Sequence, residues 1–366
     1  MSTEALSQPT VGQSTRQAPR VAGDRQHRAR YTLIILLALL VVVSLTSLTV
    51  GASDTSLWNT LLKLVSGDAI STREQVILFD IRAPRTAMGI LVGASLAVSG
   101  AVMQGLFRNP LADPGLVGVG AGAGLGAISA IVLGTMLPAS VTALMGNYLV
   151  PFAAFCGGWI TTLVLYRIST RHGRTSVAVM LLAGIALGAL AGALSGILVY
   201  LADDSQLRDL TFWGLGSLAG ATWIKLLAAA PLIILALLVT PFLARSLNAL
   251  ALGEAAASHL GVPVQRMKNI AIMMVAAATG AAVAVSGGIG FIGIVVPHLL
   301  RLAIGPDHRY LLPNAALLGA SLLLVADMIS RTIVAPAELP IGIITATLGG
   351  PFFLYILLRN RGVLDM

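Results

Sequence analysis

The chain has 366 residues, of which 57% are hydrophobic and only 10% are charged, and its formal net charge is +8. A soluble domain carries about 25% charged residues, so this chain has too few to coat a water-facing surface of its size. The composition excludes a soluble cytoplasmic enzyme, a secreted disulfide-stabilised domain and a disordered regulator. The single cysteine, Cys156, has no second cysteine in the chain for a disulfide. The sequence therefore predicts an integral membrane protein.

The N-terminal segment 1–30 is polar and basic, and it is expected to form a disordered cytoplasmic tail. The apolar run 31–50 follows, and twenty helical residues span about 30 Å, the thickness of the hydrocarbon core. A cleaved signal peptide is the alternative, but both the polar lead and the apolar run are too long for one. Nine further spans are predicted at 86–107, 115–135, 147–167, 177–201, 222–243, 269–286, 290–304, 311–330 and 341–358.

The predicted fold is an all-α membrane domain over residues 31–361, with about ten transmembrane helices and a short C-terminus at 362–366. The eighth span is the shortest, and the segment 202–220 has room for a short additional helix. An even number of spans places both termini on one side. With that side cytoplasmic, 16 of the 23 basic residues fall in cytoplasmic segments, as the positive-inside rule requires. Anionic lipid headgroups thus account for the basic charge, and no nucleic-acid partner is predicted.

Small residues are abundant in the predicted spans, as expected where helices pack closely in lipid. The segment 118–123 fits a loose dinucleotide fingerprint, but it lies in an apolar span with no strand before it, which favours helix packing. The four residues Ala97–Gly100 recur at 284–287, in spans expected to run in opposite directions. This weak repeat is consistent with two inverted five-helix halves.

Nucleotide and ion-coupling residues are scarce. The chain has three lysines, none of which follows a glycine, so it lacks the Gly-Lys pair of a P-loop. If ATP drives this protein, another polypeptide must bind it. Asp327 is the clearest acidic residue within a span, and an ion pair with Arg331 at i+4 is its simplest role. An ion-coupled secondary transporter usually needs several carboxylates or histidines within the membrane, and a membrane-embedded enzyme needs a catalytic cluster that is not apparent.

Several motifs occur together in one order along the chain. They are Arg82-Ala83-Pro84-Arg85, the run 93–104, Arg108-Asn109-Pro110-Leu111-Ala112-Asp113-Pro114, the run 252–261, the run 290–298 and Glu338-Leu339-Pro340-Ile341-Gly342. Through these motifs the chain resembles the permease subunits of the iron-siderophore, haem and vitamin B12 ABC importers, the FecCD family, over about 31–361.

The resemblance implies a non-catalytic subunit of the bacterial inner membrane that forms a homodimer. It would work with two ATPase subunits, which would bind ATP and Mg²⁺, and with a periplasmic substrate-binding protein. The loop 244–268 would contact the ATPase, and within it a short helix from Glu254 is expected to end at Gly261, ahead of Pro263. A plain connecting loop is the alternative. The expected coupling residues are Gly253, Glu254, Ala255, His259, Leu260 and Gly261.

The family also implies a docking site and a gate. Three arginines on the outer side, Arg82, Arg85 and Arg331, would pair with glutamates of the binding protein; headgroup anchoring is the alternative. The cytoplasmic gate would lie where Pro110 stops the second span and where a Thr-Ser pair caps the fifth. Helix capping alone is the simpler interpretation of that pair. The gate residues are Asn109, Pro110, Leu111, Thr175 and Ser176.

The cargo is less well specified. Glycines recur every four residues on the fifth span and either line the pathway or pack against a neighbouring helix. The segment 202–218 resembles haem permeases more than cobalamin permeases, so haem is the expected cargo, with a ferric siderophore next and cobalamin last. The five histidines do not form a ligand set, and no metal site or bound cofactor is predicted. The glycine stripe consists of Gly184, Gly188, Gly192 and Gly196.

Overall fold

The computed structural model describes residues 25–51, 63, 66, 70–171 and 174–359, and this part of the chain is almost entirely helical. Its β-structure is one antiparallel pair, β1 (Thr170–Arg171) with β2 (Arg174–Thr175). The helices are α1 (Gln26–Thr49), α3 (Thr72–Gln75), η1 (Val76–Arg82), α4 (Ala83–Phe107), η2 (Pro114–Val117), α5 (Val119–Leu133), η3 (Gly134–Met136), α6 (Ala139–Met145), η4 (Gly146–Tyr148), α7 (Leu149–Ser169), α8 (Val177–Leu201), α9 (Asp204–Leu215), α10 (Trp223–Leu250), α11 (Glu254–His259), α12 (Val264–Ser286), α13 (Ile292–Ile304), α14 (His308–Ser330) and α15 (Ile341–Arg359).

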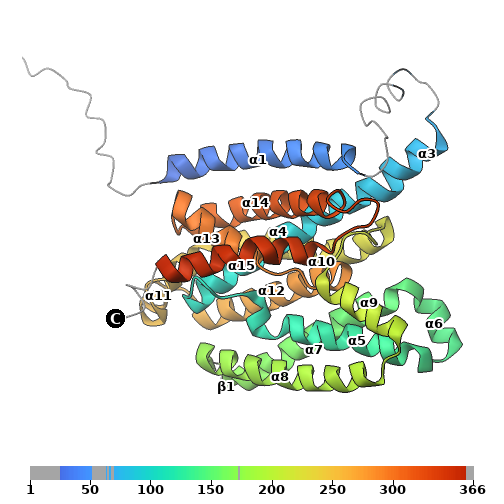
Figure 1. The fold of residues 1–366 in the computed structure, drawn as a ribbon. Helices are drawn as coiled ribbons and strands as arrows, with labels where there is room; N and C mark the ends of the chain where they lie inside the picture. The colour runs from blue at the N-terminus through green and yellow to red at the C-terminus, as the bar shows by residue number, and fades with distance from the viewer. Residues whose placement is uncertain (1–24, 52–62, 64–65, 67–69, 172–173, 360–366) are drawn as a thin grey trace, which may run out of the picture.

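The long helices lie side by side in a bundle (Figure 1). Helix α1 runs along one edge beside α14, and α8 runs along the opposite edge. The start of α1, the end of α15, α11 and β1 lie at one end of the bundle. Helices α3, α6 and α9 lie at the other end. On the predicted topology, the end that carries α11 is the cytoplasmic end and the end that carries α3 is the outer end.

Helix α4 forms the centre of the bundle and packs against α10, α12, α13 and α14. Close approach to two of these helices depends on glycine pairs that leave no room for a side chain. A Cβ atom on Gly93 would collide with the backbone of Gly319 in α14, and one on Gly100 would collide with the backbone of Gly293 in α13. Small residues allow helices to approach in this way inside a membrane.

The segment 118–123 takes part in the packing of α5 against α7, which is the helix-packing role that the sequence predicts. A Cβ atom on Gly122 would collide with the backbone of Gly157 in α7, and Gly126 approaches Ala153 of α7 in the same way. Helices α5 and α7 are therefore tightly apposed, with small residues facing each other. This contact accounts for Gly122 and Gly126, whereas a Cβ atom on Gly120 would meet nothing within 4 Å among the described residues.

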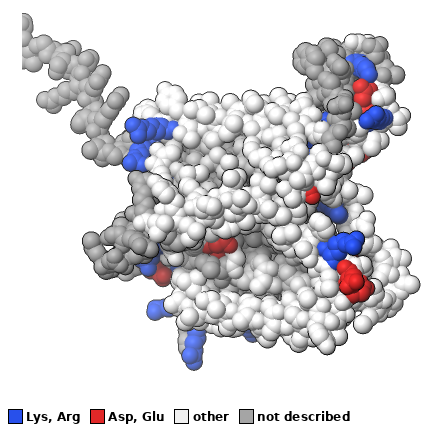
Figure 2. All heavy atoms as spheres, in the orientation of Figure 1, with Lys and Arg blue, Asp and Glu red and all other residues white. Residues whose placement is uncertain are grey.

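Every predicted span corresponds to a helix. Among the described residues, eight helical segments are long and apolar enough to cross a membrane, while α13 and α15 are shorter. The count of ten spans therefore stays a prediction. The middle of the face in Figure 2 is largely uncharged, and many large apolar side chains are exposed, as expected of a surface that faces lipid.

Several helix bounds differ from those predicted, among them the start of α1 and the end of α10. Helix α1 begins at Gln26, so the last residues of the predicted tail are helical; residues 1–24 and 360–366 lie outside the described part. Helix α10 continues to Leu250, well beyond the predicted end at 243, because its last turns bury Leu247 and Leu250 against the bundle. The additional helix expected within 202–220 is α9, capped by Asp203, whose carboxylate accepts the backbone N–H of Gln206.

Candidate functional site

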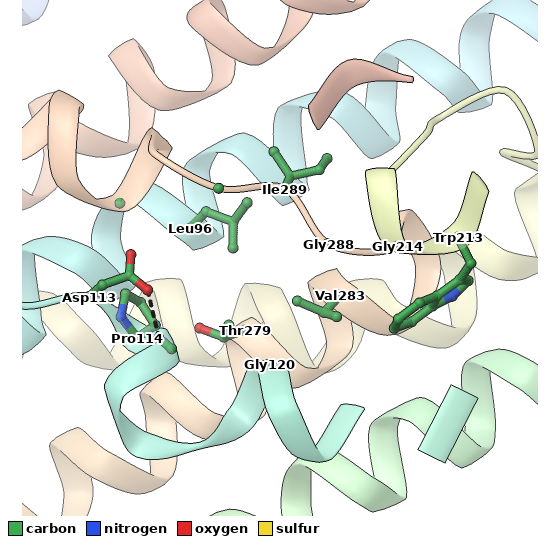
Figure 3. A pocket seen from close by; sticks show the side chains of 13 residues that line it. Leu96, Asp113, Pro114, Gly120, Trp213, Gly214, Thr279, Val283, Gly288 and Ile289 are labelled. Carbon is green, nitrogen blue, oxygen red and sulfur yellow. Dashed lines mark hydrogen bonds between the residues drawn. The ribbon is translucent and has the colours of Figure 1, made fainter. Parts of the chain in front are cut away.

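A cavity of about 300 Å³ lies inside the bundle, between the segment that follows α4 and the end of α9 (Figure 3). Its walls are mostly apolar or small: Leu96 of α4, Val283 of α12 and Ile289 of the α12–α13 loop. Trp213 closes the end nearest α9. Such a lining suits a passage that must release its cargo, because it offers few groups that could hold one tightly.

Asp113 is the one charged residue among those that line this cavity. Its carboxylate caps η2, because Oδ1 accepts the backbone N–H of Gly115 at 2.7 Å. Burial raises the pKa of Asp113 above its usual value, and the hydrogen bond from Gly115 opposes that rise. A half-buried carboxylate at the wall of an apolar cavity was not anticipated from the sequence, where Asp113 is one residue of a motif.

The predicted gate residues form the turn after α4 and the entry to α8. Arg108 adopts a left-handed conformation that ends α4, and the Asn109 side chain accepts the backbone N–H of Leu111 at 2.9 Å. Ser176 caps α8 as predicted by accepting the N–H of Val179. Thr175 is not the cap; it is buried in β2 and hydrogen-bonded to Thr170 across the hairpin.

The predicted coupling loop contains the expected short helix, α11, but the loop is shorter than 244–268. Helix α10 ends at Leu250 and α12 starts at Val264. Gly253 and Gly261 bracket α11 with φ of +104° and +80°, conformations that favour glycine. Most of α11 is exposed, including His259 and Leu260, and only Ala257 is buried. The helix is thus a small projection that a partner can reach.

The three outer arginines are not displayed on the surface as docking residues would be. Arg82, Arg85 and Arg331 are only 3%, 4% and 5% exposed. Arg85 forms ion pairs with Asp327 at 2.8 Å and with Glu338 at 2.9 Å. The three arginines line a pocket of about 290 Å³ at the outer end of the bundle, together with the apolar side chains of Ile77 and Ile81.

The predicted pair between Asp327 and Arg331 is present, with 3.6 Å between Oδ2 and Nε. Its setting differs from the expected interface, because Asp327 is completely buried. The stronger partner is Arg85, whose guanidinium donates to both carboxylate oxygens from α4. Residues 85 and 327 lie far apart in the sequence, so no local pattern could have revealed this contact.

The predicted glycine stripe lies on α8, the helix at the edge of the bundle. Gly184 is buried. A Cβ atom on Gly188, Gly192 or Gly196 would meet nothing within 4 Å among the described residues. Packing against another helix of the same chain, the simpler interpretation, therefore does not account for these three positions.

One residue that the sequence analysis did not single out joins two predicted sites. Lys268 of α12 lies between Glu254 of α11 and Thr175 of β2, and its ammonium group donates to both. Its signal in the sequence was weak: it is one of three lysines and sits at the predicted start of an apolar span.

Comparison with known proteins identifies the family. A sequence model described as the FecCD transport family matches residues 39–359. The chain is 47% identical over 337 residues to the hemin transport system permease protein HmuU of Yersinia pestis, covering 91% of this chain and 96% of that one. It is 43% identical over 343 residues to the vitamin B12 import system permease protein BtuC of Escherichia coli, covering 93% and 98%.

Solved structures agree. An inward-facing conformation of a metal-chelate type ABC transporter superposes with a TM-score of 0.79 and 32% identity, covering 90% of this chain and 99% of that chain. PsaBC from Streptococcus pneumoniae, solved in complex with a Fab, gives a TM-score of 0.53 over 78% of this chain and 94% of that one; at 17% identity this likeness shows the fold alone.

The described helices form a bundle long and apolar enough to span a membrane, with an apolar cavity inside it. The chain belongs to the FecCD transport family, and it is an ABC transporter permease of the inner membrane. The resemblance inferred from its motifs is thereby confirmed.

Proposed function

We propose that this chain is the permease subunit of an importer that moves haem, or another iron chelate, from the periplasm to the cytoplasm by alternating access. It works as a homodimer with two ATPase subunits and a periplasmic binding protein. ATP and Mg²⁺ are bound by the ATPase, and this chain binds no cofactor of its own. Both termini face the cytoplasm.

The observation that carries the choice of cargo is the 47% identity to a hemin permease over nearly the whole of both chains. The segment 202–218, which contains α9, supports the same choice through its resemblance to haem permeases. The 43% identity to a vitamin B12 permease keeps cobalamin as an alternative, alongside a ferric siderophore.

The geometry of α8 supports a pathway shared by two copies. Its outward face is rich in apolar residues and carries Gly188, Gly192 and Gly196 with free space beside them. In a homodimer these glycines would face the partner's α8 or the passage between the copies. Small residues there leave width for a large flat chelate.

Docking of the binding protein is proposed at the outer pocket lined by Arg82, Arg85 and Arg331. Because the guanidinium groups are recessed, a glutamate of the binding protein would have to enter this pocket. Complementary charges of this kind steer the approach of a partner and fix its register.

An ion-coupled secondary transporter is less well supported. Asp327, the carboxylate that could relay an ion, is held between Arg85 and Arg331. A neutralised, completely buried carboxylate is a structural element, since releasing it would leave two arginines without a counter-charge.

The test is reconstitution of the permease with its ATPase in liposomes, with binding protein and cargo outside. ATP-dependent uptake of haem is expected, and uptake should cease with an ATPase variant that cannot hydrolyse ATP. Uptake of cobalamin or a ferric siderophore without haem would correct the cargo. Uptake driven by a proton or sodium gradient without the ATPase would refute the importer assignment.

A further inference from the structure

Lys268 occupies an unusual position for a lysine. It lies in the second turn of α12, and its side chain is only 3% exposed. Burial of an ammonium group is costly unless charged and polar partners surround it. Here the Nζ atom lies 2.6 Å from Oε1 of Glu254 in α11 and 3.1 Å from the backbone oxygen of Thr175 in β2. One ammonium group thus bridges two segments that are distant in the sequence.

The contact with Thr175 is reinforced by the preceding turn of α12. Gln265 accepts the backbone N–H of Thr175 at 2.8 Å and donates to its hydroxyl group at 2.5 Å. The same hydroxyl lies 2.8 Å from that of Thr170 across the hairpin. Every polar group of Thr175 is therefore tied to α12 or to β1, so the hairpin must follow α12 when that end moves.

The contact with Glu254 is different, because α11 is otherwise joined to the bundle by its short links to α10 and α12 and by its packing against these two helices. Its one buried residue is Ala257, whereas the Glu254 side chain is 49% exposed. A charge-assisted hydrogen bond is directional and about twice as strong as a neutral one. The carboxylate of Glu254 therefore gives a displacement of α11 a direct, directional route to the buried Lys268.

We propose that Lys268 is the positioning residue that transmits movement of α11 to the Thr175–Ser176 segment. The inference rests on the proposed function, in which α11 contacts the ATPase. Ser176 caps α8, so a shift of Thr175 moves the start of the helix that carries the open glycine face. The ammonium group of Lys268 thereby links the site of ATP-driven force to the entry of the pathway helix.

The experiment uses the complete complex of permease, ATPase and binding protein, with Cys156→Ser as the background. Spin labels are placed in separate proteins at two exposed positions, Ser258→Cys on α11 and Arg174→Cys on β2. Distances between the two copies are measured with and without ATP. In the native background and in Lys268→Arg, both labels are expected to move. In Lys268→Met, the α11 label should move and the β2 label should not.

Transport supplies the second readout. Cargo moved per ATP hydrolysed should fall at least about fivefold in Lys268→Met, the low end of typical coupling between sites. Lys225→Met is the matched control, because Lys225 also donates to a backbone oxygen, that of Gly220, but at the outer end of α10. Its transport ratio should match the native protein.

The double variant Glu254→Lys with Lys268→Glu, which reverses both charges, distinguishes a purely structural role of Lys268 from a role in transmitting movement. This double variant restores the ion pair, but an ionised carboxylate cannot donate to the oxygen of Thr175. It should unfold at a higher temperature than Lys268→Met while its transport ratio stays low. Recovery of the ratio together with stability would overturn the proposal.

The remaining outcomes are equally decisive. If the β2 label in Lys268→Met moves as far as it does in the native protein, the proposed role of Lys268 is overturned, while the coupling role of α11 stands. An α11 label that does not respond to ATP in the native complex, or an ATPase that does not associate, would overturn the proposed coupling role of α11 and the inference with it.

Discussion

The carboxylate of Asp327 joins the outer end of α14 to that of α4 through Arg85, and it also pairs with Arg331 at the end of its own helix. Replacing it with asparagine leaves two buried guanidinium groups without their shared counter-charge, which should destabilise the fold by about 3–5 kcal/mol. Glu338→Gln is the control, because the Glu338 side chain is 37% exposed to solvent and Arg85 keeps its pair with Asp327 in this variant, so its loss should cost less than that of Asp327. Thermal unfolding of the purified permease in detergent, followed by tryptophan fluorescence, tests whether Asp327→Asn lowers the melting temperature more than Glu338→Gln does. Equal melting temperatures for the two variants would contradict it.

Asp113 and Asp307 are carboxylates whose pKa values are displaced in opposite directions. Burial raises the pKa of Asp113, with an opposing hydrogen bond from Gly115. Burial would also raise the pKa of Asp307, but hydrogen bonds from Arg309 and Asn248 outweigh it and lower the pKa to about 2. Asp307 caps α14, so its charged form is also favoured by the helix N-terminus.

The two displacements predict opposite dependences on pH. The raised pKa of Asp113 means that the folded state holds its proton longer, so stability falls as pH rises from the unfolded pKa through the folded one. Asp113→Asn, which can still accept from Gly115, should therefore gain stability relative to native more at pH 7 than at pH 4. The lowered pKa of Asp307 makes its stabilisation complete above the unfolded pKa and lost as pH falls toward 2. Asp307→Asn should lose more stability at pH 7 than at pH 3. Melting temperatures of the native protein and of both variants at these pH values test the two predicted directions. If both variants gain stability, or both lose it, relative to the native protein as pH rises, the opposite pKa displacements of Asp113 and Asp307 are refuted.

At the level of helices, the sequence predicts best where local signals are complete. The bounds of α8 agree residue for residue, because Ser176 caps its start and Asp203 begins the next helix. Helix α11 was found because Gly261 and Pro263 mark its end. The end of α10 was missed because Arg245 and Asn248 are typical of a loop, although Leu247 and Leu250 on the same turns are buried.

Contacts between helices could not be predicted, since they depend on residues far apart in the chain. Arg85 meets Asp327 across 242 positions, and Lys268 meets Thr175 across 93. The glycine composition indicated close packing but not which glycines face a helix. The structure separates Gly93, which touches α14, from Gly188, which has open space beside it.

The different surroundings of Gly93 and Gly188 predict different effects when each glycine is replaced by leucine. Gly93→Leu drives a side chain into the backbone of α14 and should destabilise the permease by about 1–3 kcal/mol or more, as overpacking does. A Cβ atom on Gly188 meets nothing within 4 Å among the described residues, so Gly188→Leu should change stability by no more than about 0.5 kcal/mol, the range of ordinary surface substitutions. Unfolding in detergent measures both. Transport by Gly188→Leu should nonetheless fall if this face lines the shared pathway, and native transport would place the pathway elsewhere.

Helix α4 runs between the two ends of the bundle and connects the outer pocket to the cytoplasmic turn. The helix starts at the arginine cluster with Arg85, passes the cavity at Leu96 and ends at the turn that contains Asn109. Because nearly all of α4 is buried against four neighbouring helices, it has little freedom to bend. A change at the outer pocket is therefore expected to reach the cytoplasmic turn as a rigid displacement.

The recessed outer arginines make direct charge reversal a poor test of docking, because it would break the buried ion pairs first. Ile81 offers a cleaner position: it lines the same pocket and is 48% exposed. Ile81→Glu adds a negative charge at the pocket without touching Asp327, and it should repel an incoming glutamate of the binding protein. Association with the permease in nanodiscs should slow by about tenfold at low ionic strength, as expected when steering charges are opposed.

Salt dependence distinguishes this effect from a change of shape. The Debye length falls from about 10 Å at 0.1 M salt to about 3 Å at 1 M, so the difference between native and Ile81→Glu should shrink as salt is added. Ile81→Gln, of similar size but uncharged, should associate at the native rate throughout. If Ile81→Glu and Ile81→Gln associate equally fast at every ionic strength, the binding protein does not dock at this pocket. The buried arginines then serve the fold alone, through Asp327 and Glu338.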